Sequence, residues 1–246
     1  MPLVFLHGVP EDLHVWDDLL SELSDLDTVA LGLPGFCAPL PTNFRATKEG
    51  YIAWLIAALE GFAEPVDLVG HDWGGILTSR IATARPDLVR SFATDVLAFF
   101  HPEFTWHPLA KVWATPGAGE AFMEEQGRLS VDERAAQYVA MGVSTKYARR
   151  LAIPDSVKTG CILELYRSST ALHLDWGANA APPTVPGLHL VGAKDPFAAA
   201  ALSGPVRQRF DMKQEVIEGA GHFWPSQDPK AGARAIRRFV EGSRAG

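Results

Sequence analysis

The 246-residue sequence predicts an α/β protein with a doubly wound, mostly parallel sheet and an inserted helical cap. Two features indicate this fold class. Short apolar runs alternate with segments of helical periodicity, which is typical of a parallel sheet covered by helices on both faces. From about residue 101 to residue 183, in contrast, several short helical patterns follow one another without a strand pattern.

Six apolar runs are predicted to form the strands. In chain order they are Leu3–Leu6, Thr28–Leu33, Val66–Val69, Arg90–Leu97, Leu188–Val191 and Gln214–Ile217. Apolar residues recur at helical spacing over Leu13–Leu23 and Tyr51–Leu59, and Gly61 is expected to cap the second of these helices. A third helix is expected after residue 72, ending before Pro86.

The middle of the chain is predicted to be a separate helical unit. One of its helices is expected to begin at Ser130, which together with Glu133 matches a capping box. The Pro182–Pro183 pair marks the return to the sheet. We therefore expect a core of residues 1–100 and 182–246, and a cap of residues 101–181.

The composition narrows the class of partner. The net charge is −7 and no Lys/Arg cluster stands out, so nucleic acids and anionic membranes are poor candidates. Two cysteines cannot make a disulfide framework, and no Cys/His spacing suggests a metal site. Neither a signal peptide nor a membrane span is predicted. We expect a cytoplasmic monomer or homodimer that acts on a small apolar substrate with water.

The stretch "GHDWGG" at residues 70–75 lies between a predicted strand and a predicted helix. Asp72 could simply cap the helix. The strand–Gly–x–Asp–x–Gly–Gly–helix pattern fits a nucleophile elbow better, because its glycines permit a sharp turn. A carboxylate, with a reference pKa of about 3.9, is ionised at neutral pH. It can displace a leaving group from saturated carbon, whereas attack on a carbonyl would give a high-energy anhydride.

Ionisable residues follow most of the predicted strands. His7, Asp72, Asp95, Asp195 and His222 lie at or near strand carboxyl ends, which share one edge of a parallel sheet. The order Asp72, Asp195, His222 matches the order nucleophile, acid, histidine. We therefore expect His222 to be the base and Asp195 to orient it, with Asp95 as the alternative acid.

The loop "HGVP" at residues 7–10 follows the first strand. The backbone N–H groups of Val9 and Trp73 are predicted to form an oxyanion hole. His7 is expected to order this loop at the border of the substrate site.

Together, "HGVP", "GHDWGG", "GAKD" and "GAGHF" resemble the epoxide hydrolase and haloalkane dehalogenase branch of the α/β-hydrolases over nearly the whole chain. This resemblance implies the α/β-hydrolase fold, an aspartate nucleophile at Asp72, the base His222 and the acid Asp195. It also implies that no metal or organic cofactor takes part. The usual N-terminal hairpin is missing, so Leu3–Leu6 is expected near an exposed sheet edge that a dimer could cover.

Residues of the cap are expected to decide which leaving group the protein can accept. The segment "GCILELYRSST" resembles the part of epoxide hydrolases that carries an acid tyrosine, which implies that Tyr166 protonates an epoxide oxygen. A second acid tyrosine is not evident, although Tyr138 or Tyr147 could serve. For a halide, indole N–H groups of Trp73 with Trp106 or Trp113 could be the donors.

Epoxide hydrolysis is preferred, with haloalkane dehalogenation, a non-catalytic ligand-binding protein and an esterase or lactonase as alternatives. An apolar cavity is expected from Phe99, Phe100, Phe104, Trp106, Trp113, Phe122, Met123 and Leu165. His7, Trp106 and Trp113 are predicted to contact the substrate.

Overall fold

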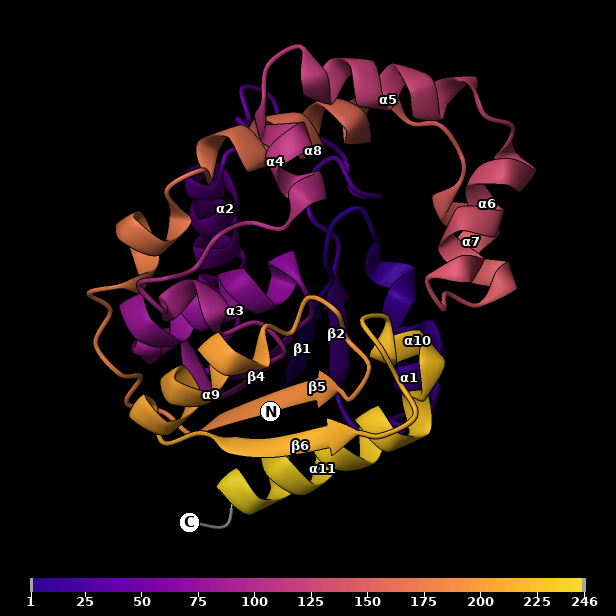
Figure 1. Ribbon diagram of the computed structural model, residues 1–246. Helices are drawn as coiled ribbons and strands as arrows, with labels where there is room; N and C mark the ends of the chain where they lie inside the picture. Colours follow the sequence, from indigo (N-terminus) through magenta and orange to yellow (C-terminus); the bar gives the residue numbers. More distant parts are fainter. Residues whose placement is uncertain (1, 245–246) are drawn as a thin grey trace.

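The computed structural model describes residues 2–244, and its centre is a six-stranded parallel sheet (Figure 1). The strands are β1 (Leu3–Leu6), β2 (Thr28–Leu31), β3 (Val66–Gly70), β4 (Val89–Thr94), β5 (Gly187–Gly192) and β6 (Lys213–Ile217). Their order in the sheet is β2-β1-β3-β4-β5-β6. The chain thus winds outward in both directions from β1 and β3, as the sequence predicts.

All six predicted strands are present, and all except β1 have shifted ends. The largest difference is at β4, which was expected to continue to Leu97 but ends at Thr94. Its partner β5 pairs only with Phe92, Ala93 and Thr94, so the apolar residues beyond Asp95 belong to a loop and a short 3-10 turn. Asp95 therefore comes directly after the strand.

Eleven α-helices are formed by the described residues. They are α1 (Asp17–Ser21), α2 (Lys48–Glu60), α3 (Trp73–Ala84), α4 (Pro108–Ala114), α5 (Ala118–Arg128), α6 (Val131–Ala140), α7 (Thr145–Leu151), α8 (Ser156–Ser168), α9 (Ala200–Arg209), α10 (Trp224–Gln227) and α11 (Pro229–Arg244). Gly61 caps α2, and Ser130 and Glu133 form the predicted capping box of α6. The first helical pattern is a 3-10 turn, Leu13–Trp16, followed by α1.

The helices cover both faces of the sheet because the strands alternate their side chains. In β1, Val4 and Leu6 pack in one apolar cluster with α2 and α3. Leu3 and Phe5 pack in the other cluster, with α1 and α11. Every side chain of β1 is buried.

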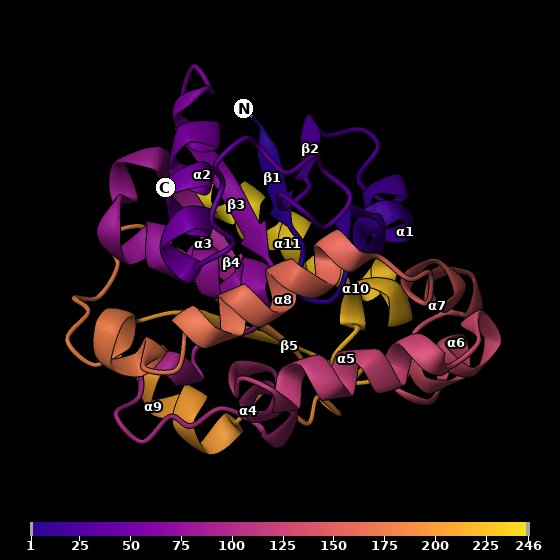
Figure 2. The same cartoon turned by 90° about the horizontal axis from the view of Figure 1, so that it is seen from above.

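The segment between β4 and β5 contains helices α4 to α8 and no strand among its described residues. We call these five helices the cap. Seen from above in Figure 2, α8 crosses over the core, while α6 and α7 lie at the end of the cap away from α4. That end is held at Asp12, whose backbone is hydrogen-bonded to the Tyr147 hydroxyl and whose carboxylate binds Arg150. The cap limits of residues 101 and 181 stay a prediction.

The two edge strands of the sheet are β2 and β6. Leu3–Leu6 lies near an edge, as expected, because β1 pairs with the edge strand β2 on one side and with β3 on the other. The residues of β2 are half-buried. Dimerisation through this edge and a cytoplasmic location stay predictions. Among residues 2–244, no helix combines the length and the hydrophobicity needed to cross a bilayer.

Candidate active site

Asp72 lies in the sharp turn between β3 and α3. Its backbone has φ 50° and ψ −120°, a strained conformation for a residue other than glycine. Its side chain makes no capping hydrogen bond to α3, so the helix-cap alternative is not supported. Gly8 permits the loop after β1 to approach, because a Cβ there would lie 2.5 Å from the Asp72 Cβ. The turn therefore has the geometry of a nucleophile elbow.

The Asp72 carboxylate is held by the loop after β1. The backbone N–H of Val9 donates to Asp72 Oδ1 at 2.8 Å. The backbone N–H of Asp72 itself donates to Asp95 Oδ1 at 2.9 Å, which fixes the turn from the other side. Trp73 is the first residue of α3, where a backbone N–H lacks an intrahelical acceptor. Val9 and Trp73 thus lie where the predicted oxyanion donors are needed.

His222 lies between two aspartates in the loop after β6. Its Nδ1 is 3.1 Å from Asp195 Oδ2, and its Nε2 is 3.8 Å from Asp72 Oδ2. The Asp195 side chain is only 3% exposed, whereas those of His222 and Asp72 are 12% and 20% exposed. Asp195, not Asp95, is therefore in position to orient the imidazole.

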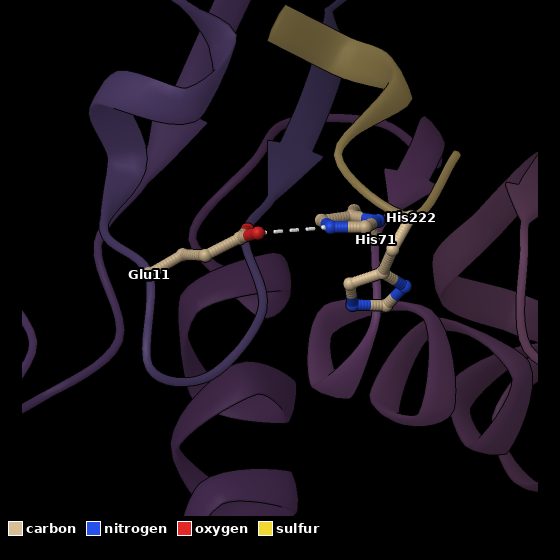
Figure 3. Close-up of side chains that lie close together, drawn as sticks. All are labelled: Glu11, His71 and His222. Atoms are coloured by element: carbon tan, nitrogen blue, oxygen red, sulfur yellow. Dashed lines mark hydrogen bonds and ion pairs between the residues drawn. The ribbon is translucent and has the colours of Figure 1, made fainter. Parts of the chain in front are cut away.

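Asp95 is instead part of a buried charge network beneath the elbow. Its Oδ2 is hydrogen-bonded to His71 Nδ1 and accepts the indole N–H of Trp224 at 2.8 Å. On the other side of the ring, His71 Nε2 is 3.1 Å from Glu11 Oε1, and the ring lies 4.8 Å from that of His222 (Figure 3). All of these groups except His222 are fully buried.

The charges of this network follow from its geometry. Burial alone would lower the pKa of His71, but the carboxylates of Glu11 and Asp95 raise it well above the ordinary value. His71 is therefore an imidazolium. Its positive charge opposes protonation of His222, whose pKa is nevertheless raised because the hydrogen bond and charge of Asp195 outweigh burial and His71. The charge of His71 thus limits how far the pKa of His222 rises.

Sequence reasoning missed Glu11 and His71. Both adjoin the motifs, since Glu11 follows "HGVP" and His71 precedes Asp72. Their side chains and that of His222 bring potential metal ligands within 4.8 Å of one another. Both nitrogens of His71 are already bound to carboxylates, and an imidazolium cannot coordinate a cation. This set therefore suits a charge network better than a metal centre.

Because Asp72 must be ionised to react, we expect activity to fall at low pH. Burial raises its pKa from 3.8 to about 6, although His222, His71 and the Val9 N–H oppose the rise. Because the carboxylate must be ionised to attack, the rate of ester formation should fall about tenfold per pH unit below about pH 6. Stopped-flow kinetics from about pH 4 to about pH 9 measure this step. A rate that stays constant down to about pH 4.5 would contradict the assignment.

The triad opens into a cavity of about 920 Å³ between the cap and the core. Asp72, Asp195 and His222 line it. Five of the eight predicted apolar residues line it as well: Phe104, Trp106, Trp113, Phe122 and Met123. Phe99, Phe100 and Leu165 do not, because they are buried in the core cluster that joins the cap to α2 and α3.

The prediction that His7 contacts the substrate is wrong. Its ring is fully buried and does not line the cavity. Both ring nitrogens are engaged, one with the Gly8 carbonyl and the other as acceptor of the Leu33 N–H. Burial lowers its pKa to about 4, so it is neutral and orders the loop after β1.

Tyr166, from α8, lines the cavity. Burial raises the pKa of its hydroxyl well above the usual value, and the charge of Asp72 adds to the rise, which indicates that the two groups are close. The Trp73 indole acts in the opposite direction, although it forms no well-aligned hydrogen bond with the hydroxyl. The Tyr166 ring packs on Trp73, Trp106 and Trp113, at centroid distances of 5.6, 5.3 and 4.9 Å.

Trp106 is not available to bind a halide, because its indole N–H donates to the Ser169 carbonyl at 2.8 Å. The indole N–H groups of Trp73 and Trp113 are buried and have no partner among the described residues. Tyr147 is not a second acid, since its hydroxyl binds the Asp12 backbone. Tyr138 lines the cavity and remains a candidate.

A family model described as the alpha/beta hydrolase family matches residues 3–235. The chain belongs to this family. It is 29% identical, over 98% of its length and 90% of the relative's, to (E)-2-((N-methylformamido)methylene)succinate hydrolase of Acinetobacter baylyi. It is 26% identical to epoxide hydrolase 3 of Xenopus tropicalis, over 97% of this chain and 71% of that one.

Among solved structures, a haloalkane dehalogenase loop variant from Bradyrhizobium elkanii superposes with a TM-score of 0.72. The match covers 99% of this chain and 90% of that one at 21% identity, which supports the fold alone. The α/β-hydrolase fold is thereby confirmed, and the epoxide hydrolase and haloalkane dehalogenase among the similar proteins support the predicted branch. The chain is a member of a hydrolase family.

Proposed function

We propose that this alpha/beta hydrolase family member hydrolyses epoxides through a covalent ester on Asp72. One observation carries the proposal: a carboxylate, rather than a hydroxyl, stands at the elbow, in contact with a backbone donor and facing the base His222. Tyr166 in the same cavity favours an epoxide, because an alkoxide leaving group needs a proton donor.

In the first step, an Asp72 oxygen attacks an oxirane carbon and the carbon–oxygen bond breaks. Tyr166 gives its proton to the departing alkoxide. Its pKa is raised partly by the charge of Asp72. Ester formation removes that charge, so the phenolate becomes easier to form as the reaction proceeds. The products are a hydroxyalkyl ester on Asp72 and a phenolate at Tyr166.

In the second step, His222 takes a proton from water, and the hydroxide attacks the carbonyl carbon of the ester. The negative charge that develops on the ester oxygen is stabilised by the N–H groups of Val9 and Trp73. The intermediate then expels the diol oxygen, which takes the proton of the newly formed carboxyl group. The proton on His222 returns through solvent to Tyr166, so one epoxide and one water become one diol.

Haloalkane dehalogenation is the second candidate. The observation that favours it is that the indole N–H groups of Trp73 and Trp113 have no partner among the described residues, while both rings pack against Tyr166. Weak donors of this kind suit a halide. The first step would then release the halide without needing Tyr166, and the second step would be unchanged.

Two other readings are less well supported. The Acinetobacter relative is named for hydrolysis of an amide-bearing succinate. For this chain, attack by Asp72 on an acyl carbon would give an anhydride, which makes acyl transfer unfavourable. A ligand-binding protein would not require Asp72 and Asp195 to lie on the two sides of the His222 imidazole, as they do here.

Two substitutions separate the epoxide reading from the halide reading. Tyr166→Phe should lower diol formation from a terminal epoxide by about 10²-fold or more and leave bromide release from a matched bromoalkane little changed. Trp113→Phe removes an indole donor while keeping a ring, and should have the opposite selectivity. Diol yield and bromide release measure the two reactions. Equal losses for both substrates in Tyr166→Phe would contradict its role as the acid.

A further inference from the structure

Three basic side chains line the cavity, one each from three cap helices. They are Lys111 of α4, Arg134 of α6 and Lys158 of α8. Within residues 2–244, no hydrogen bond or ion pair joins the charged group of any of them to another residue. Lys111 is exposed and can be solvated by water, whereas Arg134 and Lys158 are half-buried, where charges more often have partners.

The acidic groups of the cap that line the same cavity are already bound. Glu120 pairs with Arg167, and Glu124 pairs with Arg128. Asp155 caps α8 by accepting the N–H groups of the helix's first turn.

On the core side, each acid of the cavity wall is bound to a histidine or lies beside one. Asp95 is bound to His71, Asp195 to His222, and Asp72 lies beside His222. The three cap cations are therefore the charged groups of the cavity wall that lack a bound partner among the described residues.

Of the three cations, Arg134 gives the clearest indication of what the cavity binds. Its Nε atom is buried and has no hydrogen-bond partner. An unsatisfied, buried guanidinium N–H is costly, so this site is incomplete as it stands. Tyr138, one turn further along α6, lines the cavity next to it. A planar guanidinium with free N–H groups is suited to bind a carboxylate through two parallel hydrogen bonds.

The position of Arg134 indicates that a ligand must be elongated to reach both this residue and Asp72. Helix α6 lies at the end of the cap away from α4 in both views (Figures 1 and 2), yet Arg134 and Asp72 line one continuous cavity. Its volume of about 920 Å³ is at the upper end of the range for small-molecule sites. A compact substrate could not reach both residues and fill this space.

We infer that the substrate is an elongated, mainly apolar molecule with a terminal carboxylate that binds Arg134, while the reacting carbon lies at Asp72. The reacting end rests on the proposed function, and the carboxylate end does not. The inference refines the expectation of a small apolar substrate, because one end of the molecule is anionic. Lys111 and Lys158 contribute a favourable field at the cavity wall.

The first test uses a terminal epoxide of about ten carbons with an ω-carboxylate, and its methyl ester. In Arg134→Gln, kcat/KM for the carboxylate should fall about 10- to 100-fold, while kcat/KM for the ester stays the same. Arg134→Lys should recover part of the loss. Arg128→Gln, which removes an exposed, paired arginine, is the matched control and should change neither substrate. Equal losses for acid and ester would overturn the inference, because they would show that Arg134 does not act on the carboxylate of the ligand.

The second test does not depend on turnover. An alkanoate of the same length without an epoxide should bind the wild type and quench its tryptophan fluorescence, and Arg134→Gln should weaken binding about 10-fold or more. The methyl ester should bind both forms alike. Equal binding of the acid by both forms would overturn the inference. If the acid binds as expected but no epoxide or haloalkane is turned over, the proposed function fails and the assignment of Arg134 stands.

Discussion

Replacement of Asp72 by asparagine is expected to abolish the turnover of epoxides and haloalkanes, with a loss of at least about 10⁴-fold in kcat. An amide is not nucleophilic toward saturated carbon, so no ester can form. The fold should persist, since asparagine tolerates a positive φ and its carbonyl oxygen can still accept the Val9 N–H. Steady-state kinetics with freshly prepared variant measure the loss.

The same substitution is expected to stabilise the fold. The pKa of Asp72 is about 6 in the folded chain, against 3.8 as the ordinary value. The folded state thus holds this proton more tightly, so the free energy of unfolding falls as the pH rises from about 4 to about 6 and stays lower above that range. Asparagine removes this penalty. We expect a gain of about 1–3 kcal/mol near neutral pH, measured by thermal unfolding.

Asp211 supplies the matched control for Asp72. It is an exposed aspartate whose backbone φ is also 50°, but it lies in a surface turn. Asp211→Asn should leave both turnover and stability unchanged. Two results would contradict the account: an Asp72→Asn enzyme with substantial activity, or one less stable than the wild type near neutral pH.

Replacement of His222 by glutamine is expected to stop the reaction half-way. Asp72 can still attack, but no base activates water, so kcat should fall about 10³-fold or more while one equivalent of ester forms. The mass of the intact protein should rise by the full mass of an epoxide, which adds without losing an atom. A haloalkane should add its mass less hydrogen halide. Intact-protein mass spectrometry therefore also identifies the leaving group.

His107 is the matched control for His222. It lines the same cavity and packs on Phe197, as His222 does, but it caps α4 and is bound to neither aspartate of the triad. His107→Gln should not accumulate ester. An unmodified His222→Gln protein after incubation with substrates that the wild type consumes would contradict the covalent account.

The sequence was sufficient to predict the sheet and the proximity of the three candidate catalytic side chains, because both depend on local patterns. Alternating apolar runs mark the strands, and the carboxyl ends of parallel strands share one edge. Asp72, Asp195 and His222 were therefore expected to meet, and they do. No single apolar run shows which strands form the edges of the sheet, because strand order depends on the crossovers.

Partners that depend on the packing of distant segments could not be predicted. Glu11 and His71 become a buried ion pair only when the loop after β1 folds over the elbow. The indole N–H of Trp106 was expected to be available to a ligand, but it donates to the carbonyl of Ser169, which lies on another segment of the chain. Likewise, an arginine in an amphipathic helix normally faces solvent, so the sequence gives no sign that Arg134 lines the cavity.

Isotope transfer from water to Asp72 tests the covalent ester most directly. With enzyme in excess over an epoxide in oxygen-18 water, one turnover should give a diol without the label, because its new oxygen comes from Asp72. The peptide that contains Asp72 should become heavier by about 2 Da, since water attacks the ester carbonyl. A first-turnover diol that carries oxygen-18, together with an unlabelled Asp72 peptide, would show that water attacks the substrate directly and would contradict the proposed mechanism.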